Sequence, residues 1–283
     1  MWLDTQARGM TTPTHHVDAV VTCFRIGDAL GRGERLGVTE LADRTGVAKS
    51  SVYKHLDTLR AMGYVTKTAD GRYSLSLRWF EAGTALRQRQ DVFQLATDEL
   101  DALAARTGET VSLVVEEDGD AVYLSQVSEG DDAGAPVGVG ERFPAPISVG
   151  GKAILSYRPS DEVDTILAAN DLTDQGERLR TELSSIRSQR MVIERDSPLQ
   201  GTFSAGAFEG HRHVVGHDEP YRDLHSVAVP IRDPSDYAVA AIEVSGTESS
   251  LYGRRLEEEI ASSLVTTARD LETALIQRGE TER

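Results

Sequence analysis

Cysteine is nearly absent from this sequence of 283 residues, in which Cys23 is the only one. A single cysteine excludes an internal disulfide and a cysteine-rich zinc site, and favours a reducing, cytoplasmic setting. No apolar run approaches the roughly 18 residues that a membrane helix needs. The first residues lack the basic start and apolar stretch of a secretory signal. The sequence therefore predicts a soluble, cytoplasmic protein without a membrane partner.

Lysine is also scarce, with four lysines beside 26 arginines, while Asp and Glu number 46 and the formal net charge is -16. An excess of carboxylates with few lysines is typical of proteins that work in concentrated salt, where a hydrated acidic surface maintains solubility. An ordinary acidic protein from a GC-rich genome is the alternative. On either interpretation, most of the surface is expected to repel nucleic acid.

The charge is unevenly distributed along the chain. Residues 1–80 contain 11 Lys and Arg against eight Asp and Glu, whereas residues 81–283 contain 19 against 38. Because nucleic-acid binding depends on cations that neutralise phosphates, only the N-terminal segment is suited to it. This segment is therefore the candidate for a nucleic-acid partner.

Residues 14–78 are predicted to form a winged helix-turn-helix domain. Apolar residues recur at helical spacing over residues 14–30, 38–46 and 49–62, with a tight turn between the last two segments. An alternating segment follows, and its Asp70-Gly71 pair is a strong hairpin signal. Helix, short helix, turn, helix and hairpin is the element order of that DNA-binding fold.

The outer face of the helix predicted over residues 49–62 carries basic and hydroxyl side chains. If Val52, Leu56 and Leu59 turn inward, these polar groups face outward and suit phosphate contacts and base-edge hydrogen bonds. Thr39 is expected to cap the preceding helix. The candidate DNA-binding residues are Thr39, Lys49, Ser50, Ser51, Tyr53, Lys54, His55, Arg60, Lys67 and Arg72, of which the last two flank the hairpin tip. The alternative is a winged-helix module that contacts protein or RNA without operator specificity.

The remainder of the chain reads as a linker helix over residues 79–92 and a second domain over residues 93–278. Trp79, Phe80 and Leu86 of the linker are candidates for packing on a partner. The second domain alternates strand and helix patterns. Helices that flank an antiparallel sheet indicate an α+β architecture.

Five segments, in order along the chain, carry a family resemblance. They are LADRTGVAKSSVYKHLDTLRAMGYVTKTADGRYSLSLRWFEAG, RTGETVSLVVEEDGDAVYLSQV, GERFPAPISVGGKAIL, LHSVAVPI and AAIEVSG. In these segments the chain resembles the IclR family of transcription regulators, and the likeness covers about residues 15–276. The first segment is the most specific of the five.

The resemblance implies a winged helix-turn-helix joined by a linker helix to a GAF-like effector-binding domain with an antiparallel sheet. It also implies a sequence-specific transcription regulator whose affinity for a double-stranded DNA operator changes when a small organic molecule binds the C-terminal domain. Such a molecule acts only if its affinity differs between the two states of the protein. The implied partners are the operator, the effector and further copies of the chain, as a homodimer or a dimer of dimers.

The resemblance further implies an effector pocket, whose residues in this sequence are Ser148, Gly151, Lys152, Ser226, Glu243 and Ser245. Glu243 departs from the family pattern, in which serine is common at this position. A carboxylate in the pocket would repel an acidic effector unless Lys152 offset it. The departure therefore favours a polyol, a sugar derivative or a cation, whereas a shifted register that turns Glu243 outward would remove this argument.

Two further kinds of chemistry receive weak support. A segment over residues 197–223, longer than is usual in the family, contains His211, His213 and His217, which are weak metal candidates or ordinary polar loop residues. GTFSAG lacks the first glycine of a nucleophile elbow, and PAPISVGGKA lacks the leading glycine and final hydroxyl of a phosphate-binding loop. We therefore expect neither an enzyme nor a cofactor.

Overall fold

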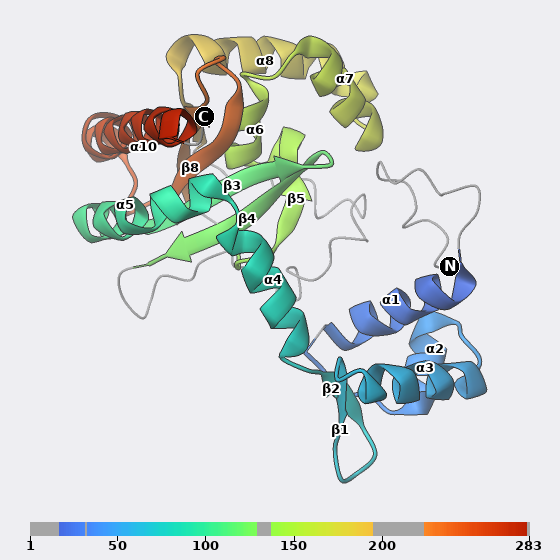
Figure 1. Ribbon diagram of the computed structural model, residues 1–283. Coiled ribbons are helices and arrows are strands. Elements are labelled where there is room, and N and C mark those ends of the chain that lie inside the picture. Colours follow the sequence, from blue (N-terminus) through green and yellow to red (C-terminus); the bar gives the residue numbers. More distant parts are fainter. Residues whose placement is uncertain (1–16, 32, 129–136, 195–223, 282–283) are drawn as a thin grey trace. The chain divides into compact units, whose positions relative to one another are not determined.

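The computed structural model describes residues 17–31, 33–128, 137–194 and 224–281 (Figure 1). The described chain up to Gln88 forms one compact unit, and the chain from Arg89 forms a second. The candidate metal ligands His211, His213 and His217 lie outside the described residues. None of the helices in the described part of the chain is long and apolar enough to cross a membrane.

The first unit is a winged helix-turn-helix, as the sequence predicts. Three helices are followed by a two-stranded antiparallel hairpin in which Val65 pairs with Leu75. Gly71 lies in the hairpin turn, where its backbone N–H donates to the carbonyl of Thr68. The elements are α1 (Asp18–Gly31), α2 (Val38–Thr45), α3 (Lys49–Ala61), β1 (Val65–Lys67) and β2 (Tyr73–Leu75).

A small apolar core holds the three helices together. Ile26 of α1 and Leu41 of α2 are fully buried, and Val52, Leu56 and Leu59 form the buried side of α3. The prediction for the inward face of α3 is therefore confirmed. Burial of these side chains is the main stabilising contribution in so small a unit, and it fixes which side of α3 remains in contact with solvent.

The ends of α2 are set by glycine and glutamate. Gly46 closes the helix at a φ of 69°, a left-handed conformation that favours glycine. At the other end, Thr39 is expected to act as the cap, but the helix begins at Val38 and its capping position is Gly37, two residues before Thr39. The carboxylate of Glu40 accepts a hydrogen bond from the Gly37 backbone N–H at 2.7 Å. The Thr39 cap is therefore wrong, because Glu40 satisfies this helix end.

Helix α4 (Arg78–Gln88) is the last element of the first unit. Trp79 packs within its own unit, because its indole N–H donates to the Tyr64 carbonyl at 3.1 Å and its ring lies edge-on to Tyr64 and Phe24. Phe80, in contrast, is 65% exposed. Of these two aromatic residues of the predicted linker, only Phe80 is therefore free to pack on a partner.

The second unit is built on a six-stranded antiparallel sheet with the order β5-β4-β3-β8-β7-β6. The hairpin of β3 and β4 and the hairpin of β7 and β8 confirm the strand pairs predicted from the sequence, whereas the short β5 and β6 were not predicted. The strands are β3 (Thr110–Glu117), β4 (Asp120–Val127), β5 (Arg142–Pro144), β6 (Val192–Glu194), β7 (Leu224–Arg232) and β8 (Ala238–Thr247).

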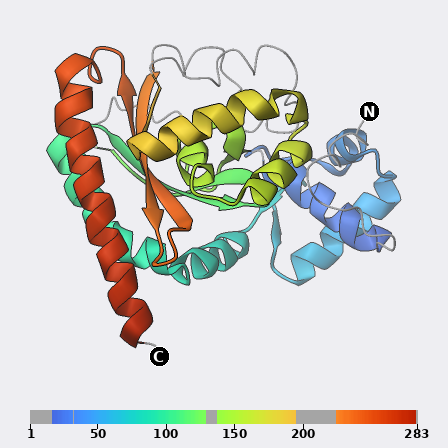
Figure 2. The ribbon, with the colours of Figure 1, turned by 90° about the horizontal axis from the view of Figure 1, so that it is seen from above.

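Helices cover both faces of this sheet (Figure 2). On one face, α5 (Asp91–Thr107) and α10 (Ala261–Thr281), which continues the π-helical turn η5 (Arg255–Ile260), pack on a core that includes Leu100 and Ile242. The opposite face carries a second core with Val114 and Ile154. Its helical elements are η2 (Ala145–Ile147), α6 (Val149–Leu155), α7 (Ser160–Ala169), η3 (Thr173–Gln175) and α8 (Gly176–Gln189). The predicted α+β architecture is confirmed.

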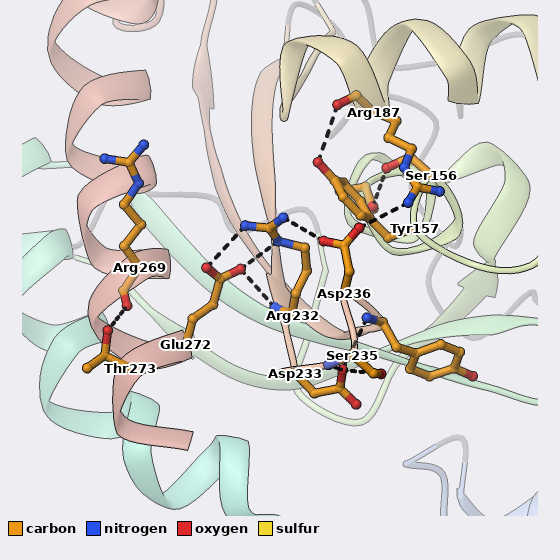
Figure 3. A network of polar contacts seen from close by, with 12 residues as sticks. Ser156, Tyr157, Arg187, Arg232, Asp233, Ser235, Asp236, Arg269, Glu272 and Thr273 are labelled. Carbon is orange, nitrogen blue, oxygen red and sulfur yellow. Dashed lines mark hydrogen bonds and ion pairs between the residues drawn. The ribbon is translucent and has the colours of Figure 1, made fainter. Parts of the chain in front are cut away.

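A polar network ties α8 and α10 to the end of the β7–β8 hairpin (Figure 3). Arg232 binds Glu272 of α10 at 2.7 Å and Asp236 at 2.8 Å. Asp236 also pairs with Arg187 of α8 at 3.0 Å. The guanidinium groups of Arg187 and Arg232 both lie over the ring of Tyr157, a favourable cation–π arrangement. The network therefore links elements that pack on opposite faces of the sheet.

Candidate functional site

The outward side of α3 is a polar ridge made by Lys49, Ser50, Tyr53 and Lys54. All four are exposed, and Tyr53 is 54% exposed despite its size. Within the part of the chain that the structure describes, neither lysine has an ion-pair partner. We refer to these four residues as the α3 ridge. Its hydroxyl and ammonium groups are free to contact phosphates and base edges in a major groove.

Two other candidates of the first unit, His55 and Arg72, are engaged within the unit. His55 is half-buried, with its ring nitrogens 2.8 Å from the Ser51 carbonyl and 3.2 Å from the Ala19 carbonyl of α1. Arg72 donates to the Arg35 carbonyl at 2.7 Å and to Glu40 at 3.2 Å. The structure therefore gives His55 and Arg72 bracing positions within the domain, which differ from the DNA-facing positions expected of them.

The remaining candidates of the first unit are spread around the α3 ridge. Thr39 is exposed in the first turn of α2, and Ser51 is half-buried beside His55. Arg60 pairs with Asp57 at 3.6 Å, while both stay in contact with solvent. Lys67 extends over the ring of Tyr73, its strand partner at the turn end of the hairpin. These positions suit contacts with a nucleic-acid backbone better than contacts with bases.

In the second unit, the carboxylate of Glu243 points away from solvent toward α6. Glu243 is 6% exposed, and its Oε2 accepts hydrogen bonds from the Tyr123 hydroxyl and the Gly150 backbone N–H, both at 3.1 Å. Burial, opposed by these hydrogen bonds, raises the pKa of Glu243 from 4.5 to about 7. The inward register is confirmed, and the outward alternative is wrong.

Lys152 does not neutralise Glu243. Its ammonium group binds Glu182 of α8 at 2.7 Å and Glu194 of β6 at 2.6 Å. The pKa of Lys152 is raised because these two carboxylates outweigh the desolvation of the buried amine. One cation is thus shared by two carboxylates, and Glu243 is left without a cationic partner among the described residues.

Ser148 and Gly151 have structural positions at the start of α6. The Ser148 hydroxyl caps the helix by accepting from the Gly151 backbone N–H at 3.1 Å. A side chain at Gly151 would collide with the Ala145 carbonyl, and one at Gly150 would meet Val114 at 2.9 Å and Glu243 at 3.1 Å. Gly150 therefore allows α6 to lie close to the sheet beside Glu243, whereas Gly151 allows the tight turn that leads from η2 into α6.

The inner face of the sheet, which we define as the face covered by α6, carries a row of polar side chains. Glu194 of β6 pairs with Ser226 of β7, and Ser226 pairs with Ser245 of β8. Glu243 lies two residues from Ser245 and hence on the same face. Ser226 is also close enough to Glu243 to lower the pKa of that carboxyl group. The structure thus brings together Lys152, Ser226, Glu243 and Ser245, four of the six predicted effector residues.

Sequence reasoning missed three members of this site, which are Tyr123, Glu182 and Glu194. Tyr123 lies on β4, where alternation with Ala121 placed it on a buried face, but nothing local indicated its partner 120 residues away. No local sequence pattern marks Glu182 or Glu194 as site residues, because only the tertiary fold brings them to Lys152. Among the described residues, no group of three His, Cys, Asp or Glu is arranged to hold a metal ion.

The raised pKa of Glu243 predicts that the stability of the protein depends on pH. Between pH 4.5 and about 7 the folded protein retains a proton that the unfolded chain releases. The free energy of unfolding should therefore fall as pH rises through this window, by roughly 3 kcal/mol for Glu243. Denaturant unfolding at pH 5 and pH 7.5 measures this change in the free energy of unfolding, which should be clearly smaller in Glu243→Gln than in the wild type. A remainder of the same sign is expected from Glu194, whose pKa is also raised. An unchanged difference would contradict this assignment.

Comparisons with known proteins agree with this geometry. Residues 84–273 match the family model described as "Bacterial transcriptional regulator IclR C-terminal", and residues 24–69 match "IclR helix-turn-helix domain". The HTH-type transcriptional regulator KdgR of Escherichia coli (strain K12) is 28% identical over 256 residues, which cover 90% of this chain and 91% of that protein. KipR of Bacillus subtilis (strain 168), another HTH-type transcriptional regulator, is 24% identical over 221 residues, or 78% of this chain and 82% of that protein.

Solved structures share the fold. The crystal structure of Thermotoga maritima IclR superposes with a TM-score of 0.69 at 23% identity, covering 92% of this chain and 99% of that one. The shared architecture therefore includes both the helix-turn-helix unit and the unit with the antiparallel sheet.

Proposed function

Because the chain belongs to the IclR family of transcriptional regulators, we propose that its α3 ridge reads an operator in the major groove. The protein is a DNA-binding regulator with an N-terminal helix-turn-helix domain and a C-terminal ligand-binding domain. In a helix-turn-helix, the second helix of the motif enters the major groove and its N-terminal residues contact base edges. Lys49, Ser50, Tyr53 and Lys54 occupy the first turns of α3.

The observation that carries this assignment is the division of α3 into two sides. Its aliphatic side is buried in the core, whereas its polar side has exposed cations without ion-pair partners in the described chain. Thr39, Ser51, Arg60 and Lys67 are assigned to phosphate contacts around the ridge. His55 and Arg72 act indirectly by bracing α3 and the hairpin.

The domain divisions proposed here are the winged helix-turn-helix at residues 14–78, a linker helix at 79–92 and the effector-binding domain at 93–278. The two compact units, which meet between Gln88 and Arg89, support this arrangement. The linker is thereby divided between the end of α4 and the start of α5.

The active form is proposed to be a homodimer built on the first unit, which can pair further into a dimer of dimers. Val17, Val20 and Phe24 form an apolar stripe along the start of α1 with exposures of 66, 52 and 55%. Leu77 and Phe80, at the start of α4, are 78 and 65% exposed. Apolar surface of this kind marks an interaction site, and a two-fold dimer would bury the same patch on both copies.

Footprinting of the full-length protein on DNA from its own promoter region tests the proposal as a whole. A dimer predicts two protected half-sites related by two-fold symmetry and separated by about one helical turn or a multiple of it. Protection without symmetry, or no protection at all, would favour the alternative of a protein- or RNA-contacting module. Because the composition supports a cytoplasmic protein that works in concentrated salt, the assay is placed at molar KCl.

The effector is proposed to bind between α6 and the inner face of the sheet, in contact with Lys152, Ser226, Glu243 and Ser245. Ser148 and Gly151 shape this site through the close packing of α6. The site's carboxylates disfavour a simple acid and support a sugar-like or other small organic molecule. Binding there changes operator affinity only through a difference in effector affinity between two states of the protein.

A further inference from the structure

We propose that the effector carries an ammonium group or another cationic hydrogen-bond donor, which binds between Glu194 and Glu243 on the inner face of the sheet. This inference rests on the proposed function, since it names the chemical class of ligand for the same site. It narrows the three ligand classes that Glu243 favoured in the sequence, a polyol, a sugar derivative or a cation, to the cation.

The first argument is the charge balance of the site. The site holds three carboxylates, Glu182, Glu194 and Glu243, but one ammonium group, that of Lys152, which binds only the first two. Glu182 and Glu194 already occupy Lys152 at 2.7 and 2.6 Å, and the negative charge of Glu194 reaches Glu243. An acidic ligand would add a further negative charge to a desolvated cluster, which is strongly unfavourable. A cation compensates the excess.

The second argument, independent of charge, is an unused acceptor atom on the same face. The Oε2 atom of Glu194 is buried and accepts no hydrogen bond. Ser245, which is 6% exposed, adds a hydroxyl that can accept as well as donate. Ser226 lies between Glu194 and Ser245 in the strand register, which places these atoms on neighbouring strands. A buried polar atom is rarely left unpaired, so the group expected to contact Glu194 Oε2 is a hydrogen-bond donor.

A cation explains these observations better than a neutral polyol. Hydrogen bonds from an ammonium group to a carboxylate are roughly twice as strong as neutral ones. Burial is the largest cause of the raised pKa values of Glu194 and Glu243, and a neighbouring carboxylate adds to it in each case, Glu182 for Glu194 and Glu194 for Glu243. A cationic ligand beside Glu243 would lower the pKa of that group. Binding at pH 7 should therefore release protons.

The test uses ligands that share a carbon skeleton and differ in charge. The full-length protein in molar KCl is titrated with putrescine, butane-1,4-diol and succinate, and with glucosamine, glucose and gluconate. We expect an amine to raise the melting temperature by several degrees, while its acidic counterpart has no effect. A response confined to the diol, the sugar or the acids would overturn the inference, and so would the absence of a response in both amine arms.

Two variants separate this site from general attraction to an acidic protein. Glu243→Gln keeps an acceptor for Tyr123 and Gly150, so it should fold, but it should bind the responding amine at least tenfold more weakly. Glu177→Gln is the matched control, because it removes an exposed carboxylate from α8, the helix of Glu182, and should bind normally. Equal weakening in both variants, or in neither, would contradict the assignment.

Calorimetry supplies a readout that non-specific binding would not produce. Titrations at pH 7 in two buffers of different ionisation enthalpy should show net proton release on binding of the amine, and this release should disappear in Glu243→Gln. Proton uptake would overturn the inference.

Operator footprinting is independent of this result. An acid that altered the footprint would disprove the cationic ligand and leave the proposed function intact. A missing footprint would disprove the proposed function itself.

Discussion

Replacement of Ser50 and Lys54 by alanine in the same chain is expected to reduce operator affinity by roughly 10²- to 10⁴-fold. Each good contact between a side chain and a base edge contributes about 1–3 kcal/mol, and about 1.4 kcal/mol corresponds to a factor of ten. Both residues are exposed on α3 and pack on no core residue, so the stability of the domain should change by less than about 0.5 kcal/mol. Fluorescence anisotropy with operator DNA measures the affinity, and thermal melting measures the stability.

Arg254→Ala provides the matched control for this experiment. The Arg254 side chain is 87% exposed and lies in the second unit, so its replacement also removes a surface cation from the chain. Operator affinity should stay close to that of the wild type. If the Ser50 and Lys54 double variant also bound within threefold of the wild type, α3 would not be the reading element, and a protein- or RNA-contacting role would gain support.

Introduction of aspartate at Phe24 and Phe80 is expected to dissociate the dimer and to weaken operator binding by roughly 10²- to 10⁴-fold. Both side chains are more than half exposed, so a charge at these positions is tolerated by the isolated subunit but not by a buried interface. In a dimer, binding of one subunit to its half-site raises the effective concentration of the second subunit at the other half-site. Dissociation of the dimer removes this gain, and operator affinity falls. Sedimentation velocity measures the dimer, and anisotropy measures the affinity.

Val139→Asp serves as the comparison, because Val139 is 50% exposed and lies in the second unit. It should leave both the dimer and operator binding unchanged. A double variant at Phe24 and Phe80 that still sedimented as a dimer would show that the first unit does not form the primary interface.

Local patterns in the sequence were sufficient for most of the fold. The spacing of Val52, Leu56 and Leu59 predicted the buried side of α3, since a helical period needs no long-range information. The Asp70-Gly71 pair predicted the wing because turn chemistry is local. Competition between neighbouring groups was harder to predict. Thr39 and Glu40 both suit the start of α2, and only the reach of the Glu40 carboxylate to Gly37 decides between them.

Contacts between distant segments decided what the sequence could not. Lys152 looked available for a ligand, but the fold brings Glu182 and Glu194 to it from 30 and 42 residues away. His55 was expected to face outward on the helical pattern, yet its ring lies against α1, with Nε2 3.2 Å from the Ala19 carbonyl. Such pairings depend on how helices and strands meet, and no period or motif encodes them. The resemblance predicted the residues of the effector site, whereas the structure determined the charge around them.

The most direct test of the account places a DNA-cleaving probe on α3 itself. Cys23 is replaced by serine, which leaves a chain without cysteine, and Asp57→Cys then introduces one thiol on the exposed side of α3 for an iron chelate that cuts nearby DNA. If α3 lies in the major groove, the cuts should fall within both operator half-sites and nowhere between them. Protection of the operator without cleavage at either half-site would contradict the central claim.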